Sequence, residues 1–436
     1  MSAFWCERAW LGRAPVADVR VLVDDQRISA VETGAAPRPG DQRLHGIVLP
    51  GFANAHSHAF HRALRGRTHG RGGTFWTWRE RMYTLAALLD PDSYLALARA
   101  TYAEMALAGI SSVGEFHYLH HAPGGRAYHD PNAMSEALVQ AASDAGIRLT
   151  LLDTIYLTGG MDAHGYLPLD PVQQRFSDGD VTSWAFRVAA MRERDGLRVG
   201  AAVHSVRAVP AHQLPEVPTR LLHMHLSEQP AENDACRRLH GCSPTELLAT
   251  YGLLGPNATA VHATHLSRDD LRLLAISGTT VCACPSTEAD LADGIGPFGQ
   301  LHEAEVSLCV GSDQHAAIDL LAEARAMELS QRVAGGRRGV FGARHLVDAL
   351  TATGQRALGW EDAGTIEVGQ RADLVAITLD TPATAGIDPA QVVMAAGTAD
   401  VRTVVVDGRV VVEEGHHVLG DVGQLLADAI APLWRD

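Results

Sequence analysis

Short apolar runs with strand-like composition recur between residues 48 and 314, and most are followed by a segment with helical periodicity. The helical pattern is clearest at 93–108, 133–145 and 316–333. Strands that alternate with helices favour a parallel sheet, and eight of them fit a (β/α)8 TIM barrel. We therefore expect a barrel over residues 49–368. The eight runs are 48–58, 110–118, 148–156, 197–205, 219–228, 258–265, 280–287 and 306–314.

The two ends of the chain differ from its middle. Residues 1–48 contain short alternating segments separated by turn residues, and residues 369–436 contain further strand-like runs. One of these, Val401–Val412, turns at Asp407 and Gly408, a dipeptide typical of a tight β-hairpin. Neither end is long enough for an independent sandwich. We therefore expect both ends to combine into one small β-sandwich module.

The composition restricts the class of function. The chain has 436 residues, 46% hydrophobic residues and a formal net charge of −15. This acidity disfavours nucleic acid and anionic membranes as partners, although local arginines can still attract an anionic small molecule. The six cysteines have no zinc-finger or disulfide spacing. The first residues lack a secretory hydrophobic region, and no window reaches the roughly 18 apolar residues of a membrane span, so we expect a cytoplasmic enzyme.

The chain contains no lysine, and all 36 of its basic residues are arginine. The lack of lysine excludes every mechanism that needs a lysine amine, including a Schiff base. It also excludes a carbamylated lysine that bridges two metal ions. A metal ion held by histidines and carboxylates remains as the source of chemistry.

Histidines and carboxylates stand at the ends of the predicted strands. His56 and His58 are two residues apart at the first strand end, so their side chains point the same way and can share one cation. His225 lies closer to the carboxyl end of its strand than His223, which makes His225 the better ligand. Because barrel active sites form at these ends, groups on four strands favour a metal site over isolated structural histidines. Besides His56, His58 and His225, two further groups stand at predicted strand ends, His262 and Asp313.

This order of groups resembles the amidohydrolase superfamily, and within it the mononuclear deaminase branch. The resemblance covers roughly residues 45–380 and includes the closing segment Gly364–Leu374. Where the binuclear branch has a carbamylated lysine, this chain has His204, so the resemblance implies one metal ion. Zinc is the usual choice for imidazole and carboxylate ligands, with iron and manganese as alternatives. The implied metal ligands are His56, His58, His225 and Asp313.

The resemblance also implies catalytic roles. Bound Zn²⁺ lowers the pKa of its water from about 16 to roughly 7. Asp313 would accept the proton of that water. Glu228, three residues after His225, would protonate the imine nitrogen of the substrate and then the leaving ammonia. His262 would hold the water or the developing tetrahedral centre.

Two unusual segments narrow the resemblance. Phe75–Glu80 (FWTWRE) and Glu115–Tyr118 (EFHY) are similar to the formimidoylglutamate deiminases of histidine degradation. That family hydrolyses N-formimidoyl-L-glutamate to N-formyl-L-glutamate and ammonia, and the resemblance implies a homodimer. The first segment lies within 60–82, a stretch rich in glycine, arginine and aromatic residues. We expect this stretch to be an active-site loop.

A substrate with two carboxylates and a formamidine requires guanidinium groups for carboxylate recognition. Arg207 and Arg79 are the candidates, with the Tyr118 hydroxyl and His204 as further contacts. His61 is expected to contact the substrate where the family usually has glutamine. Histidine still donates a hydrogen bond but differs in reach and tautomer. This departure bears on substrate preference rather than on the reaction class.

Two alternatives stay open. Another mononuclear deaminase of the same barrel would act on a cyclic amidine such as a purine or pterin, and its pocket should contain an aromatic or amide clamp rather than paired arginines. A barrel that serves as a non-catalytic scaffold is the alternative from another class. Such proteins tend to lose metal ligands, whereas all four are present in this chain.

Overall fold

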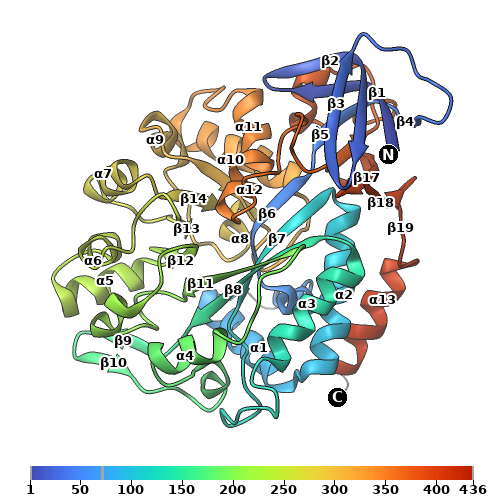
Figure 1. The fold of residues 1–436 in the computed structure, drawn as a ribbon. Helices are drawn as coiled ribbons and strands as arrows, with labels where there is room; N and C mark the ends of the chain where they lie inside the picture. The colour runs from blue at the N-terminus through green and yellow to red at the C-terminus, as the bar shows by residue number, and fades with distance from the viewer. Residues whose placement is uncertain (1, 70–72, 435–436) are drawn as a thin grey trace.

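Eight parallel strands form the barrel at the centre of the molecule (Figure 1). The structure, a computed structural model, describes residues 2–69 and 73–434. A bridge between Ser57 and Asp313 joins the first strand to the segment after the last. Each of the eight predicted runs contains one barrel strand, so the predicted (β/α)8 fold is confirmed. The strands are β6 (Phe52–Ser57), β7 (Ile110–His117), β8 (Arg148–Ile155), β11 (Leu197–Val203), β12 (Leu222–Leu226), β13 (Ala258–His262), β14 (Thr280–Ala283) and β15 (Leu308–Val310).

The ends of the chain form a mixed nine-stranded sheet beside the barrel (Figure 1). Its strands are β1 (Ser2–Leu11), β2 (Ala14–Asp24), β3 (Arg27–Thr33), β4 (Gln42–Leu44), β5 (Ile47–Pro50), β16 (Leu374–Ile377), β17 (Val401–Val406), β18 (Arg409–Glu413) and β19 (His416–His417). The two ends meet where β5 pairs antiparallel with β16. The predicted turn joins β17 to β18, and Asp407 and Gly408 both have positive φ, 50° and 74°. The extra module predicted from the chain ends is therefore present.

The first predicted run, 48–58, is two strands rather than one. Its beginning belongs to β5 in the outer sheet, and the rest forms β6 in the barrel. Gly51 separates them. A Cβ at Gly51 would lie 2.4 Å from Ser111 Oγ and 2.6 Å from Asp373 Cβ. Because the chain packs this closely where it passes from one sheet to the other, only glycine fits there.

Helices surround the barrel (Figure 1). The predicted helices 93–108, 133–145 and 316–333 correspond to α2 (Pro91–Leu107), α3 (Ala133–Ala145) and α10 (Leu320–Gly335). In the described ranges, no helix is long and apolar enough to cross a membrane. The other helices are α1 (Phe75–Leu88), α4 (Val181–Val188), α5 (Pro230–His240), α6 (Pro244–Thr250), α7 (Arg268–Ser277), α8 (Pro285–Asp290), α9 (Phe298–Glu303), α11 (Ala343–Leu350), α12 (Ala352–Ala357) and α13 (Val422–Ile430), which packs against α2.

Short elements complete the fold. A small hairpin consists of β9 (Gly160–Asp162) and β10 (Gly165–Leu167). The 3-10 helices are η1 (Ala59–Leu64), η2 (Gln173–Phe176), η3 (Ala211–Glu216), η4 (Pro389–Met394), η5 (Thr398–Asp400) and η6 (Ala431–Trp434). The stretch 60–82 is therefore largely helical, in η1 and α1, which corrects the prediction of a loop. The part of that prediction at 70–72 lies outside the described residues.

A buried ion-pair network joins the barrel to the outer sheet. Arg148 on β8 is 1% exposed, and its Nη1 lies 2.9 Å from Asp373 Oδ1 and 2.8 Å from Asp407 Oδ1. Asp373 precedes β16 and Asp407 is in the β17–β18 turn, so one guanidinium holds two segments of the module. A guanidinium buried in this way needs such partners, because an unpaired charge inside a protein is strongly unfavourable.

Candidate metal centre and active site

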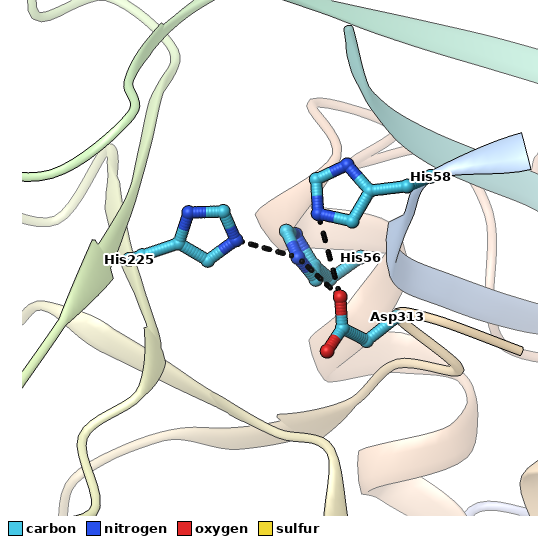
Figure 2. Close-up of side chains that lie close together, drawn as sticks. All are labelled: His56, His58, His225 and Asp313. Atoms are coloured by element: carbon cyan, nitrogen blue, oxygen red, sulfur yellow. Dashed lines mark hydrogen bonds and ion pairs between the residues drawn. The ribbon is translucent and has the colours of Figure 1, made fainter. Parts of the chain in front are cut away.

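Three imidazoles and one carboxylate converge at the carboxyl ends of the barrel strands. His56 and His58 are at the end of β6, His225 is on β12 and Asp313 follows β15. Their potential ligand atoms all lie within 4.8 Å of one another. Asp313 Oδ1 is 3.3 Å from His56 Nε2 and 3.4 Å from His58 Nε2, and the Nε2 atoms of His56 and His225 are 3.1 Å apart (Figure 2).

The backbone around Asp313 positions this carboxylate. Its φ is 42°, in the left-handed region that non-glycine residues rarely adopt. The conformation is held by two backbone hydrogen bonds to β6, from Asp313 N to His56 O (3.0 Å) and from His58 N to Asp313 O (3.1 Å). Gly311 permits the close approach, because a Cβ there would lie 2.8 Å from His56 Cβ. The ends of β6 and β15 are thereby locked together.

Backbone carbonyls orient two of the imidazoles. His58 Nδ1 donates to Phe116 O at 2.9 Å, and His225 Nδ1 donates to His204 O at 2.9 Å. With the proton on Nδ1, each Nε2 turns a lone pair toward the cluster, as in metal-binding histidines. Burial lowers the pKa of both imidazoles well below the usual range, so they are neutral and can act as ligands.

The donor set fits a divalent metal ion. The Nε2 atoms of His56 and His225 are 3.1 Å apart in this buried cluster, close enough to be ligands of one ion. Burial raises the pKa of Asp313, but the hydrogen bond from His56 and the neighbouring histidines together outweigh burial and hold the pKa well below the ordinary value. Three imidazoles and an ionised carboxylate are typical zinc ligands. A centre with this donor set can bind one ion next to a cavity.

The cavity beside the cluster has an empty volume of about 570 Å³. All five residues predicted from the sequence to contact substrate line it, together with Glu228 and His262. Tertiary structure thus brings together side chains from η1, α1 and the ends of β7, β11, β12 and β13. The five predicted residues are His61, Arg79, Tyr118, His204 and Arg207.

Aromatic side chains that sequence reasoning did not select also line this cavity. Helix α1 contributes Phe75 and Trp78, with Met82 on the same face because these three are three or four residues apart, and also the adjacent Tyr83. The sequence motif FWTWRE marks this segment as unusual. The helical spacing of its apolar residues is the signal that could have predicted this wall of the cavity. The other aromatic wall residues are Tyr156 and Phe176.

His61 and Tyr118 form one hydrogen-bonded pair in the cavity wall. His61 Nε2 and the Tyr118 hydroxyl are 2.8 Å apart, and the His61 ring packs 4.6 Å from the ring of His58. Burial lowers the pKa of His61 to about 3, so its imidazole is neutral. A neutral imidazole here can hydrogen-bond to a ligand without adding positive charge.

His262 lies between two carboxylates in the cavity. Its Nε2 is 3.6 Å from Glu228 Oε1 and 3.8 Å from Asp313 Oδ2, and its Nδ1 is 3.4 Å from Glu288 Oε1. Burial lowers the pKa of His262, but the charges of Glu228 and Glu288 outweigh burial and raise it to about 10. Burial raises the pKa of Glu228. His262 and Glu228 can therefore hold a proton and transfer it next to Asp313.

The two cavity arginines have different partners. Arg207 Nε lies 3.2 Å from Glu232 Oε2. Arg79 instead lies over the rings of Trp76 (5.3 Å) and Tyr83 (5.1 Å), and across residues 2–69 and 73–434 it makes no ion pair. Both guanidinium groups face a cavity that can accept an anionic ligand.

Three other buried histidines lie outside the cluster. His223 Nε2 is 2.8 Å from Ala357 O, so this side chain hydrogen-bonds within the barrel. His117 and His120 lie near Asp153, but that carboxylate is already paired with the Arg187 guanidinium, with Nη2 2.7 Å from Oδ1. Because Asp153 is already paired with Arg187, the described residues leave no free carboxylate beside His117 and His120 to bind a cation.

The sequence matches the amidohydrolase family over residues 47–411. The chain belongs to the amidohydrolase family. This amidohydrolase is 36% identical to the formimidoylglutamate deiminase of Pseudomonas aeruginosa, over 96% of each chain. It is 29% identical to an isoxanthopterin deaminase from an unknown prokaryotic organism, over 87% of this chain and 83% of the relative. An amidohydrolase from Brucella melitensis has a similar solved structure, with a TM-score of 0.91, 30% identity and complete coverage of both chains.

Family membership makes this amidohydrolase a hydrolase that acts on C–N bonds. The relatives compared above include deaminases of both a linear and a cyclic substrate. The family therefore establishes the type of bond that is cleaved. Which of these substrates is bound depends on the residues of the cavity.

Proposed function

We propose that this amidohydrolase hydrolyses N-formimidoyl-L-glutamate to N-formyl-L-glutamate and ammonia. The observation that carries the proposal is the presence of two arginines, Arg79 and Arg207, in the cavity that also contains the ligand cluster. Each guanidinium can bind one substrate carboxylate, ideally through two parallel N–H donors. The similarity to the Pseudomonas aeruginosa enzyme supports the same substrate.

One divalent ion, which we propose to be Zn²⁺, fits the site. His56, His58, His225 and Asp313 would hold it, and their imidazole and carboxylate donors match the preference of zinc. The ion, when bound, supplies a water whose pKa is lowered toward neutrality. All other steps belong to side chains of the protein.

Hydrolysis of a formamidine forms a C–O bond, breaks the C–N bond to the terminal nitrogen and moves protons from water to that nitrogen. Asp313 accepts the first proton from water. Glu228 delivers protons to the imine nitrogen and to the departing ammonia, a role worth about 10²–10⁴ in rate. His262, within 4 Å of both carboxylates, donates a hydrogen bond to the developing oxyanion.

The remaining cavity residues orient the substrate. His61 and Tyr118 share a hydrogen bond, and His204 packs edge-to-face against Tyr156 with ring centroids 4.5 Å apart. These contacts limit the rotamers of His61, Tyr118 and His204, so their polar atoms are held ready for the substrate. The proposal extends to a role in histidine degradation, a cytoplasmic location and a homodimer.

Deamination of a cyclic amidine such as a purine or pterin is the second candidate. The aromatic wall of the cavity favours it, because Phe75, Trp78 and Phe176 could stack on a planar ring. The isoxanthopterin deaminase is a relative with a substrate of this type by name. Paired arginines distinguish the two candidates, since a neutral ring has no need of two cations.

Ammonia release decides between these candidates. The purified protein, with its metal content measured on the same sample, is assayed with N-formimidoyl-L-glutamate, isoxanthopterin and adenosine. We expect turnover of the first compound and at least 100-fold lower kcat/KM for both rings. Turnover of a ring compound alone would reject the proposed substrate, and a scaffold would release no ammonia and contain no stoichiometric metal.

A further inference from the structure

Arg207 shares a buried ion pair with a residue outside the cavity lining. Glu232 is in the first turn of α5, and its side chain is 0% exposed. Its Oε2 lies 3.2 Å from Arg207 Nε, and the Arg207 side chain is 12% exposed. Two charges removed from water in this way are maintained only when each compensates the other.

The contact uses one particular edge of the guanidinium. In the described part of the chain, the side-chain hydrogen bond of Arg207 is the one from Nε to Glu232. A guanidinium has five N–H donors, and the four on Nη1 and Nη2 are left for the cavity. Binding a carboxylate through two parallel hydrogen bonds requires the guanidinium plane to be oriented, and a partner at Nε restricts rotation of that plane.

The same carboxylate approaches the turn that carries the proton-transfer residue. Burial raises the pKa of Glu232, and the charge and hydrogen bond of Arg207 oppose that rise, with a smaller contribution from the backbone N–H of Ser227. Ser227 lies between His225 and Glu228 and has a φ of 50°. Glu232 Oε1 is buried and has no hydrogen-bond partner among the described residues. The Glu232 carboxylate therefore lies next to both Arg207 and the turn at Ser227.

We propose that Glu232 is a positioning residue that orients Arg207 for a carboxylate of the substrate. The inference rests on the proposed function and adds a residue that determines specificity without touching the substrate. Its negative charge also competes with that of Glu228 for the Arg207 guanidinium. In this arrangement Glu228 stays available for proton transfer.

A double-mutant cycle tests the assignment. Glu232→Gln keeps the size of the side chain and removes its charge. We expect Glu232→Gln to raise KM for N-formimidoyl-L-glutamate about tenfold, with kcat changed less than threefold, which corresponds to about 1.4 kcal/mol. In the Arg207→Ala background the same change should alter KM less than twofold. Glu232→Asp, which keeps the charge, should recover part of the loss.

Two further measurements serve as controls for the cycle. Asp234→Asn removes an exposed carboxylate two residues away on α5 and should leave KM unchanged. Metal content should equal that of the wild type in every variant. An equal effect of Glu232→Gln with and without Arg207 would show a general structural role and overturn the inference.

The dicarboxylate glutarate separates this inference from the proposed function. If the wild type fails to turn over N-formimidoyl-L-glutamate, the proposed function is rejected, and the cycle is repeated with Kd for glutarate from calorimetry. We expect Glu232→Gln to raise this Kd at least fivefold, and less than twofold without Arg207. Absence of glutarate binding to the wild type would reject the role of Arg207 and that of Glu232 with it.

Discussion

His56 Nε2 and His225 Nε2 lie 3.1 Å apart although 169 residues separate them in the chain. The two side chains come from β6 and β12, on different sides of the barrel. Their approach has a physical cause in the fold, because inward-facing side chains at the carboxyl ends of barrel strands converge on the axis. Two imidazoles at this distance can be ligands of one cation.

Removal of His225 should abolish metal binding. Residues that only support a metal ligand typically cost 10–100-fold in metal affinity, so we expect His225→Ala to lose more than about 100-fold. Elemental analysis and a competition titration with a chelator measure this loss. His223→Gln on the same strand is the matched control, since it can still donate to Ala357 O and should retain the metal. Loss of metal from His223→Gln and not from His225→Ala would reverse the assignment.

Metal removal should lower the stability of the folded protein. An ion that binds the native state alone stabilises it by about 2.7 kcal/mol at a concentration 100 times Kd. We therefore expect Tm to fall on dialysis against a chelator and to recover when Zn²⁺ is added. Calorimetric scans of apo and reloaded protein check this, and Tm values that do not respond to metal would contradict a cluster that holds an ion.

Loss of either cavity arginine should impair the proposed reaction. Hydrogen bonds to charged groups contribute about 1.5–3 kcal/mol, so Arg207→Ala and Arg79→Ala should each lower kcat/KM for N-formimidoyl-L-glutamate roughly 10–150-fold. Steady-state ammonia release measures the change, with Arg81→Ala on the exposed side of α1 as control. Full activity in both Arg79 and Arg207 variants would rule out a dicarboxylate substrate.

The ion pair between barrel and outer sheet should contribute strongly to stability. Arg148→Met leaves the carboxylate of Asp373 buried without its cation, whereas Asp407 keeps Arg371, whose Nη1 lies 2.9 Å from Asp407 Oδ1. Removal of one partner of a buried pair costs about 3–5 kcal/mol. Urea unfolding measures the free energy. Removal of the exposed pair Arg402–Glu414 serves as comparison and should cost no more than about 1 kcal/mol. Equal effects of the two changes would contradict the prediction.

Acid should destabilise the protein in part through Asp153. Burial raises the pKa of this carboxyl, but the Arg187 guanidinium outweighs burial and lowers it from 3.8 to about 2. A folded-state pKa below the unfolded one means that the stabilisation is present above pH 3.8 and is lost as the pH falls toward 2. The contribution is roughly 2 kcal/mol. In Asp153→Asn, the free energy of unfolding should therefore fall less steeply between these pH values, and an unchanged slope would contradict the assignment.

The sequence alone determined the barrel and the four converging metal-site side chains. Barrel strands are covered on both faces and therefore read as apolar runs, and a residue at the carboxyl end of such a run is placed at the mouth of the barrel by the fold itself. This ground selects five groups at strand ends, and the resemblance to the mononuclear deaminase branch implies that four of them are metal ligands: His56, His58, His225 and Asp313, but not His262.

Tertiary structure decided what depends on contacts between distant segments. Gly51 divides one apolar run between two sheets because Ser111 and Asp373 pack against it. The pairing of Arg207 with Glu232 joins the end of β11 to α5, and no spacing in the chain indicates which carboxylate a buried guanidinium will meet. Local periodicity arises from backbone geometry, which each segment carries in its own residues. The partner of a buried charge is set by packing, which exists only once the whole chain has folded.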